Sequence, residues 1–169
     1  MTGIVVADTG PLIALAKAGH FQLLQQLYKE ILIPPAVHTE LCLESDRPGA
    51  KRLAEAIEQG WLDMKQPSSI VAEQISELAL MLDPGEAEAI ALAEEINCRF
   101  LLIDERKGRK IAKRRGLPVA GLAGVLLAAK QGGFIDEVMP IVKSLGEIGY
   151  RMSQSLITEI ARLAGESVS

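Results

Sequence analysis

Hydrophobic positions along the chain follow two patterns: short unbroken apolar runs, and longer segments in which apolar residues recur every three or four positions. Short runs closed by Gly, Pro or an acid are typical of buried strands in a parallel sheet. Recurrence every three or four positions indicates helices with one apolar face. Strands are predicted over residues 4–8, 30–34, 61–65, 100–104 and 117–120. Helices are predicted over about 11–18, 21–28, 36–44, 49–59, 69–81, 85–96, 106–115, 122–131, 134–146 and 153–164.

Strands and helices alternate along most of the chain. This order predicts the α/β class, as a three-layer αβα sandwich with a central, mainly parallel sheet. A chain of 169 residues is long enough for one domain with a proper core. We expect residues 1–133 to form that domain. We expect residues 134–169 to form a C-terminal helical extension that packs on the same domain or on a partner.

Composition narrows the class of protein. A hydrophobic content of 49% with only 4% aromatic residues predicts an aliphatic core. The apolar stretches are shorter than the roughly 20 residues of a membrane helix, and no basic region precedes the first one, so we expect a cytoplasmic protein. Cys42 and Cys98 lack metal-site spacing and are expected to be reduced core residues, while His20 and His38 are too scattered for zinc. The net charge of −4 argues against a protein that coats nucleic acid non-specifically.

Two acids follow predicted strands directly. Asp8 ends the run Ile-Val-Val-Ala, and Asp104 ends the run Phe-Leu-Leu-Ile. Ligands of parallel sheets bind just beyond the carboxyl ends of the strands, so both acids are placed for a site. Each also has an ordinary interpretation as a turn residue or a helix cap.

Two further acids lie on helices that flank these strands. Glu40 shares a face with apolar residues of its helix, with Glu44 as a rival one turn later. Glu86 follows the buried stripe of its helix, whereas Glu88 points the opposite way. Each is an ordinary surface acid if taken alone. Four carboxylates brought together are costly unless a cation neutralises them, and oxygen ligands alone suit Mg²⁺ or Mn²⁺ rather than zinc.

A basic segment follows Asp104. Seven cations occur within ten residues of a chain that is acidic overall: Arg106, Lys107, Arg109, Lys110, Lys113, Arg114 and Arg115. Such a density is found where proteins bind RNA phosphates, and also on solvated helix faces. Gly108, Ile111 and Ala112 would form the inward side of this helix. No aromatic residues interleave with the cations, so base stacking is not expected.

Four segments, taken in order, resemble PIN domains. They are Ile-Val-Val-Ala-Asp8-Thr9-Gly-Pro-Leu-Ile, then Ile-Pro-Pro-Ala-Val-His-Thr-Glu40-Leu, then Gly-Glu86-Ala-Glu-Ala-Ile, and Leu-Leu-Ile-Asp104. The resemblance extends from residue 4 to about 120. The segment after it is similar to a prokaryotic subgroup of unassigned function.

The resemblance implies a Mg²⁺- or Mn²⁺-dependent ribonuclease that acts on RNA. It implies that Asp8, Glu40, Glu86 and Asp104 are the catalytic, metal-binding acids, and that Thr9 orders the site. The family usually has Asp where Glu86 stands. Glu105 directly follows Asp104, and a one-residue shift would put Glu105 in its place. Many prokaryotic members are toxins of VapC-type pairs, which implies an antitoxin partner and a homodimer.

Other chemistries find no matching residues. The sequence contains no Ser/His/Asp or Cys/His grouping and no glycine-rich phosphate loop of the common types. An aspartate-nucleophile phosphatase would need a second Asp where Gly10 stands. The main alternative is a PIN-like module without activity that binds RNA or a partner protein.

Overall fold

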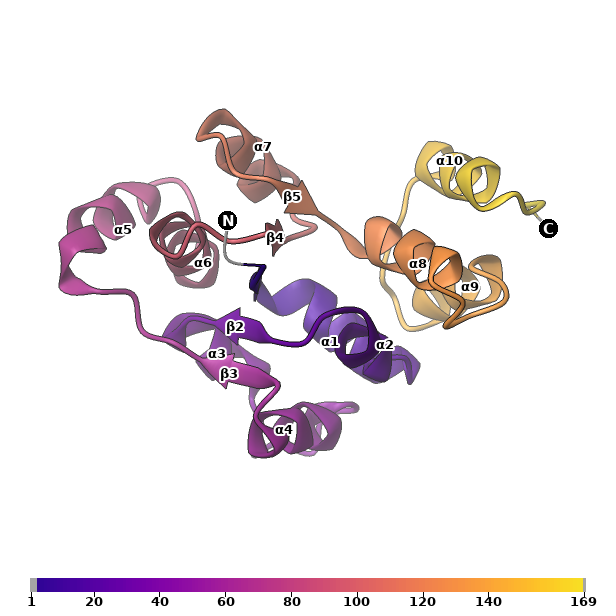
Figure 1. Ribbon diagram of the computed structural model, residues 1–169, viewed down its shortest axis with the longest axis horizontal. Coiled ribbons are helices and arrows are strands. Elements are labelled where there is room, and N and C mark those ends of the chain that lie inside the picture. The colour runs from indigo at the N-terminus through magenta and orange to yellow at the C-terminus, as the bar shows by residue number, and fades with distance from the viewer. Residues whose placement is uncertain (1–2, 169) are drawn as a thin grey trace.

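A five-stranded parallel sheet forms the centre of the computed structural model, which describes residues 3–168 (Figure 1). Its strands follow the order β3-β2-β1-β4-β5, and every neighbouring pair is parallel. The strands are β1 (Val5–Ala7), β2 (Ile31–Ile33), β3 (Leu62–Met64), β4 (Phe100–Leu102) and β5 (Val119–Ala120). All five lie within the predicted segments, so the predicted parallel α/β sandwich is confirmed.

Helices occupy all ten segments predicted to be helical. They are α1 (Thr9–Ala18), α2 (Gln22–Leu27), α3 (Pro35–Leu41), α4 (Ala50–Gln59), α5 (Ala72–Leu78), α6 (Pro84–Glu95), α7 (Arg106–Arg114), α8 (Leu122–Gln131), α9 (Met139–Glu147) and α10 (Gln154–Ala164). The segment predicted over 69–81 starts as a 3₁₀ turn, η1 (Ser69–Val71). The helix predicted from residue 134 starts at Met139, because Pro140 favours the first turn. Within residues 3–168, no helix is long and apolar enough to cross a membrane.

The two faces of the sheet carry separate apolar cores. Successive side chains of a strand point to opposite faces, so Val5, Ala7 and Leu102 lie in one core while Val6 and Ile103 lie in the other. The first core is covered by α1–α4 and α8–α10. The second core is covered by α5, α6 and α7. Because both faces are apolar, each strand appears in the sequence as an unbroken run.

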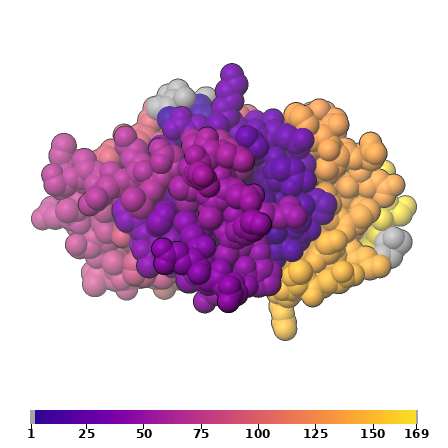
Figure 2. All heavy atoms as spheres, turned by 90° about the horizontal axis from the view of Figure 1, so that it is seen from below, coloured from indigo at the N-terminus to yellow at the C-terminus, as the bar shows by residue number. Residues whose placement is uncertain are grey.

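The helices after β5 gather at one end of the molecule (Figures 1 and 2). α9 packs on α1, and α10 packs on α8 and α9. Apolar residues of α9 and α10, such as Leu145 and Ile160, belong to the first core. Helices α9 and α10 therefore pack on α1 and α8 and share the first core with them.

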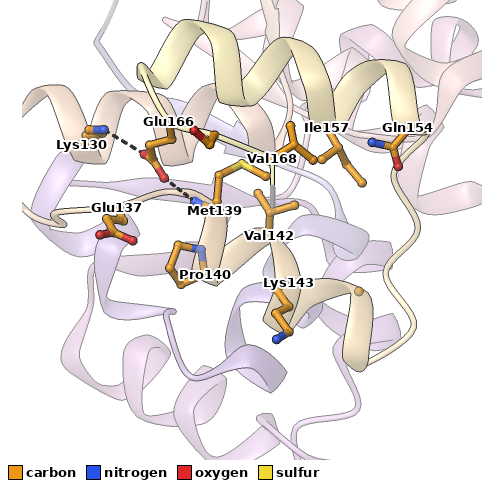
Figure 3. A pocket seen from close by; sticks show the side chains of 12 residues that line it. Lys130, Glu137, Met139, Pro140, Val142, Lys143, Gln154, Ile157, Glu166 and Val168 are labelled. Carbon is orange, nitrogen blue, oxygen red and sulfur yellow. Dashed lines mark hydrogen bonds and ion pairs between the residues drawn. The ribbon is translucent and has the colours of Figure 1, made fainter.

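Glu166 ties the end of the chain to α9 (Figure 3). Its carboxylate accepts hydrogen bonds from the backbone N–H groups of Val138 and Met139, which open α9. Lys130 of α8 donates to the same carboxylate at 2.9 Å. A cavity of about 880 Å³ opens beside this clamp between α9 and α10. None of the four predicted site acids lines this cavity.

Candidate metal centre

The chain reverses its order across the sheet between β1 and β4. From β1 the chain first builds β2 and β3 on one side, and later adds β4 and β5 on the other. At such a switch point the loops beyond the two strands diverge and leave a crevice for a ligand. Asp8 follows β1, and its N–H donates to Leu102 O of β4 at 2.9 Å. Asp104 and Glu105 follow β4 at the same edge.

The pleat of the strands decides which of these acids face one another. Asp8 lies two residues after Val6, on the face of the second core. Glu105 lies two residues after Ile103, which belongs to the same core. Asp104 has the opposite phase. The side chains of Asp8 and Glu105 therefore lie on the same face of the sheet, beside α6. The Asp104 side chain lies on the opposite face.

Asp8 is a buried carboxylate that caps nothing. It stands at the N-cap position of α1, yet its side chain accepts no capping hydrogen bond, and only 7% of the residue is exposed. Burial raises its pKa to about 7, against a lowering hydrogen bond from Thr9 N–H. The negative charges of Asp83, Glu40 and Glu105 raise the pKa further. The Asp8 side chain therefore does not cap α1 in the usual way, through a hydrogen bond from the second or third residue of the helix.

The side chain of Glu40, on α3, lies near Asp8 and Thr9. The Thr9 hydroxyl donates to Glu40 Oε2 at 2.7 Å. The carboxylate lies against Gly85 of α6, where a Cβ atom would come within 2.6 Å of Glu40 Oε1. A larger residue at 85 would displace the carboxylate. Glu44, the rival from the sequence, is exposed beyond the end of α3.

Only one of the two carboxylate oxygens of Glu86 takes part in the capping of α6. Glu86 N–H donates to Asp83 Oδ1 at 2.8 Å, and Asp83 N–H donates back to Glu86 Oε1, which forms a capping box. Glu86 Oε2 is buried without a hydrogen-bond partner. Burial raises the pKa of Glu86 to about 8, followed by hydrogen bonds with Asp83 and Glu105 and by the charges of Asp83 and Asp8. An orphaned buried oxygen of this kind is rare and calls for an unseen partner.

Glu88 does not point into open solvent, contrary to the sequence prediction. It is half-buried, and its Oε1 accepts a hydrogen bond of 3.1 Å from Ala36 N–H at the start of α3. The reason is that α6 is buried on most of its circumference, between α3, α5 and the sheet. The sequence predicted one buried face for this helix, whereas residues on most sides of it are buried.

Glu105 completes the group of acids. Its Oε2 accepts a 2.7 Å hydrogen bond from Gly108 N–H and so caps α7. Burial raises the pKa of Glu105, but hydrogen bonds from Gly108, Glu86 and Lys107 outweigh it and lower the pKa. We name the group of Asp8, Glu40, Asp83, Glu86 and Glu105 the acid cluster.

Asp104 lies outside the acid cluster. Both of its oxygens accept from Leu122 N–H at 3.2 Å, at the start of α8. Burial raises its pKa, and the bonds from Tyr150 and Leu122 and the charge of Arg109 oppose that rise. The sequence grouped Asp104 with Asp8, Glu40 and Glu86. The structure brings those three together and directs Asp104 to the other face of the sheet.

A comparison with protein-family models matches residues 4–166 to the family described as PIN domain. The chain belongs to the PIN domain family. PIN domains are generally nucleases, and they typically use divalent metal ions. No curated protein matches the chain.

The donor atoms of these acids are of the type that a hard cation prefers, although their side chains are not arranged around one point. Within residues 3–168, no three Asp, Glu, His or Cys side chains converge closely enough to hold a metal as they stand. The donors nevertheless consist only of oxygens, and they carry excess negative charge at a buried edge. Glu86 Oε2 has no other partner. Mg²⁺ and Mn²⁺ favour this donor set.

The basic segment lies on α7 of the PIN domain, directly after Glu105. Gly108 and Ala112 are buried and Ile111 is half-buried, so the predicted inward side is confirmed. Six of the seven cations are exposed: Arg106, Lys107, Lys110, Lys113, Arg114 and Arg115. Arg109 and Arg115 are used within the fold. Arg109 donates to Ile103 O at 2.8 Å, and Arg115 pairs with Glu94 at 2.7 Å.

Two residues near the site were missed in the sequence. Asp83 precedes the helix predicted over 85–96 and is not among the predicted site residues, although an Asp followed three residues later by Glu is the sequence pattern of a capping box. Tyr150 is 46 positions from Asp104, and no local pattern links the two residues. The cysteines are free, with Cys98 buried and Cys42 half-buried.

Proposed function

We propose that this PIN domain is a metal-dependent ribonuclease whose centre is the acid cluster. Asp8, Glu40 and Glu86 are three of the four acids expected from the sequence, and we assign the fourth place to Glu105 rather than to Asp104. The observation that carries the proposal is the buried, unpartnered Oε2 of Glu86 beside the buried carboxyl of Asp8. The capping box accounts for Glu86 Oε1 but not for Oε2, and the Asp8 side chain accepts no capping hydrogen bond, so a cation would account for both buried groups.

Asp8, Glu40, Glu86 and Glu105 would hold Mg²⁺ or Mn²⁺ through carboxylate oxygens or intervening waters. The cation supplies positive charge that binds a phosphate oxygen and makes water more acidic. Thr9 keeps the Glu40 carboxylate in one orientation through its 2.7 Å hydrogen bond. A carboxylate of the cluster accepts the proton of the attacking water. Hydrolysis of the phosphodiester bond follows from these roles.

The RNA would lie along α7. This helix begins at the acid cluster, because Glu105 is its N-cap. Its exposed cations Arg106, Lys107, Lys110, Lys113 and Arg114 extend away from that point over about two turns. Phosphates bound by this row would place the strand beside the metal. Arg109, also expected from the sequence to bind RNA, contributes by fixing the turn before α7 through Ile103 O.

Metal titration separates the ribonuclease from the module without activity. We expect calorimetry to detect Mn²⁺ binding that Asp8→Asn abolishes, and a labelled single-stranded RNA to be cleaved only when Mn²⁺ or Mg²⁺ is present. Lys143→Gln on α9 is the control, because Lys143 is exposed and far from β1 in the chain. RNA binding without either metal binding or cleavage would establish the inactive module instead.

We also propose, from the family resemblance, that this ribonuclease is the toxin of a type II toxin–antitoxin pair. Expression of the wild-type chain alone should then arrest growth, and Asp8→Asn should not. Co-expression of the protein encoded next to it should restore growth. Growth that continues at full rate under confirmed expression of active enzyme argues against the toxin role.

A further inference from the structure

Gly85 and Gly108 each lie in the first turn of a helix, Gly85 in α6 and Gly108 in α7. Both are buried, and neither has the positive φ that favours glycine. Within a helix alanine is ordinarily the more stable residue, because glycine loses more conformational freedom on folding. The backbone of these two turns therefore gives no reason for glycine, and the reason lies in what surrounds them.

A carboxylate occupies the space beside Gly108 in which a side chain would stand. A Cβ atom at this position would lie 2.7 Å from Glu86 Oε2, 2.7 Å from Ile103 Cδ1 and 3.6 Å from Glu105 Oε2. The N–H of Gly108 also donates to Glu105 Oε2 at 2.7 Å. One glycine of α7 thus borders two acids of the cluster, on the side where Glu86 Oε2 has no hydrogen-bond partner.

Glu86 is held against Gly108 from its other side. Its Oε1 accepts from Asp83 N–H, and its own N–H donates to Asp83 Oδ1, so the capping box fixes the carboxylate. A methyl group at position 108 would meet both Glu86 Oε2 and the end of Ile103. The carboxylate would then have to move, or α7 would have to separate from α6. Either change alters the space at Glu86 Oε2.

Gly85 stands in the same relation to Glu40 of α3. A Cβ atom there would lie 2.6 Å from Glu40 Oε1 and 3.2 Å from Glu40 Oε2, so it would press on the whole carboxyl group. The Thr9 hydroxyl holds this group by donating to Oε2 at 2.7 Å. A methyl group at position 85 would therefore disturb this hydrogen bond or separate α3 from α6.

The other glycines within the helices of residues 3–168 show no such crowding. A Cβ atom at Gly10 or Gly146 would meet nothing within 4 Å. At Gly124 it would make an ordinary contact of 3.8 Å with Ala120. Close approach of a carboxylate is therefore a property of the two positions at the acid cluster and not of helical glycine in this fold.

We propose that Gly85 and Gly108 are positioning residues of the metal centre: because they lack side chains, α3, α6 and α7 approach closely enough to bring the acid cluster together. The proposal rests on the proposed function only in taking these acids as the metal-holding ones. Its consequence is that a methyl group at either position weakens metal binding, although neither glycine contributes a ligand.

Gly108→Ala and Gly85→Ala test the proposal by calorimetry with Mn²⁺. Contacts around a metal site change metal affinity by roughly 10–100-fold, and we expect each variant to lose at least about tenfold. Gly146→Ala is the matched control, because it makes the same change at an exposed position of α9 where a Cβ atom meets nothing. It should leave Mn²⁺ affinity within about twofold. Affinities of both test variants within that range would overturn the proposal.

Urea unfolding in chelator supplies a readout that needs neither metal nor RNA. Glu86→Ala removes the carboxylate that Gly108→Ala crowds, so Gly108→Ala should shift the urea midpoint more favourably in the Glu86→Ala background than in the wild type. At pH 5, below the Glu86 pKa of about 8, the carboxyl is neutral and the difference reports space rather than charge. Gly146→Ala should shift the midpoint equally in both backgrounds. Equal shifts by Gly108→Ala would overturn the proposal.

The same cycle joins Gly85→Ala to Glu40→Ala. Should Gly108→Ala fold only together with Glu86→Ala, the crowding is shown directly. If neither folds, Gly108 is required for another reason and its positioning role is overturned. A wild-type chain that binds no Mn²⁺ would instead refute the proposed metal centre, and the two unfolding cycles would still decide whether the glycines hold the acids in place.

Discussion

Asp104 and Glu105 are adjacent in the chain, yet their carboxylates lie on opposite faces of the sheet. Asp104 accepts from Leu122 N–H of α8, and Glu105 accepts from Gly108 N–H of α7 beside Glu86. The two acids therefore have different tasks. One anchors the strand edge, and the other belongs to the acid cluster.

Substitution of each acid by its amide distinguishes these tasks. Glu105→Gln removes a charge of the cluster, and we expect a loss of Mn²⁺ affinity of more than a hundredfold with a comparable loss of cleavage. Asp104→Asn acts only through position, and about a tenfold loss is expected. Calorimetry with Mn²⁺ and cleavage of a labelled RNA measure both. The opposite ranking would make Asp104 the metal ligand and Glu105 a simple cap of α7.

The sequence could not decide between these two acids for a physical reason. In a strand that is buried on both faces, every residue is apolar, so the phase of the pleat leaves no trace in the pattern. Val6 and Ala7 differ in the core they join but not in character. The strands, their parallel order and the approximate helix bounds were predictable because apolar runs, Gly and Pro mark them. Side-chain direction at the strand ends was not.

A similar limit applies to α6. Its hydrophobic residues predicted the burial of Glu86 correctly, since Glu86 is only 5% exposed. They could not predict that α3 would approach the opposite side and donate Ala36 N–H to Glu88. Long-range contacts of this kind, like the one between Tyr150 and Asp104, arise from packing of whole elements. Local periodicity carries no information about them.

Glu86 and Glu88 offer a matched pair on one helix. Glu86→Gln leaves an amide where the unpartnered Oε2 is buried, and we expect cleavage to fall by a factor of a hundred or more. Glu88→Gln keeps an oxygen that can accept from Ala36 N–H, so cleavage should stay within about threefold. Turnover at saturating Mn²⁺ and RNA is the measurement. Equal losses in both variants would indicate that α6 is disturbed as a whole.

Asp8 should make the metal-free protein less stable as the pH rises. Its pKa is about 7 in the folded protein and about 3.9 in an unfolded chain, so the folded state binds the extra proton between these values. Stability from the protonated form is complete below about pH 4 and is lost as the pH rises through about 7. Asp8→Asn has no such loss. In chelator at pH 8 it should therefore unfold at higher urea than the wild type, by on the order of a few kcal/mol.

The comparison is made by urea unfolding at pH 5 and pH 8. The advantage of Asp8→Asn should shrink at pH 5, where the wild-type carboxyl is largely protonated. Asp63→Asn, an exposed change on β3, serves as the control and should follow the wild-type curve at both values. If Asp8→Asn is less stable than the wild type at pH 8, the ionised carboxylate of Asp8 stabilises the fold. Burial and the neighbouring negative charges would then not raise its pKa as described.

The basic segment should act on RNA affinity rather than on the chemical step. Each phosphate contact to single-stranded RNA contributes a slope of about 0.7 in the dependence of log affinity on log salt. Replacement of the exposed Lys110, Lys113 and Arg114 by Gln should therefore flatten the slope by up to about two units and weaken binding. Cleavage at saturating RNA should change much less, because the acid cluster keeps its residues.

A triple variant of equal charge separates a local footprint from the effect of net charge. Lys29, Lys51 and Lys143 are exposed on other elements, and their replacement by Gln removes the same three positive charges. Its salt slope should equal that of the wild type if α7 binds the phosphates. Fluorescence anisotropy of a labelled RNA at several salt concentrations measures both variants. Equal slopes in the two variants would show that α7 is a solvated face, and the RNA would then be held by another surface of the protein.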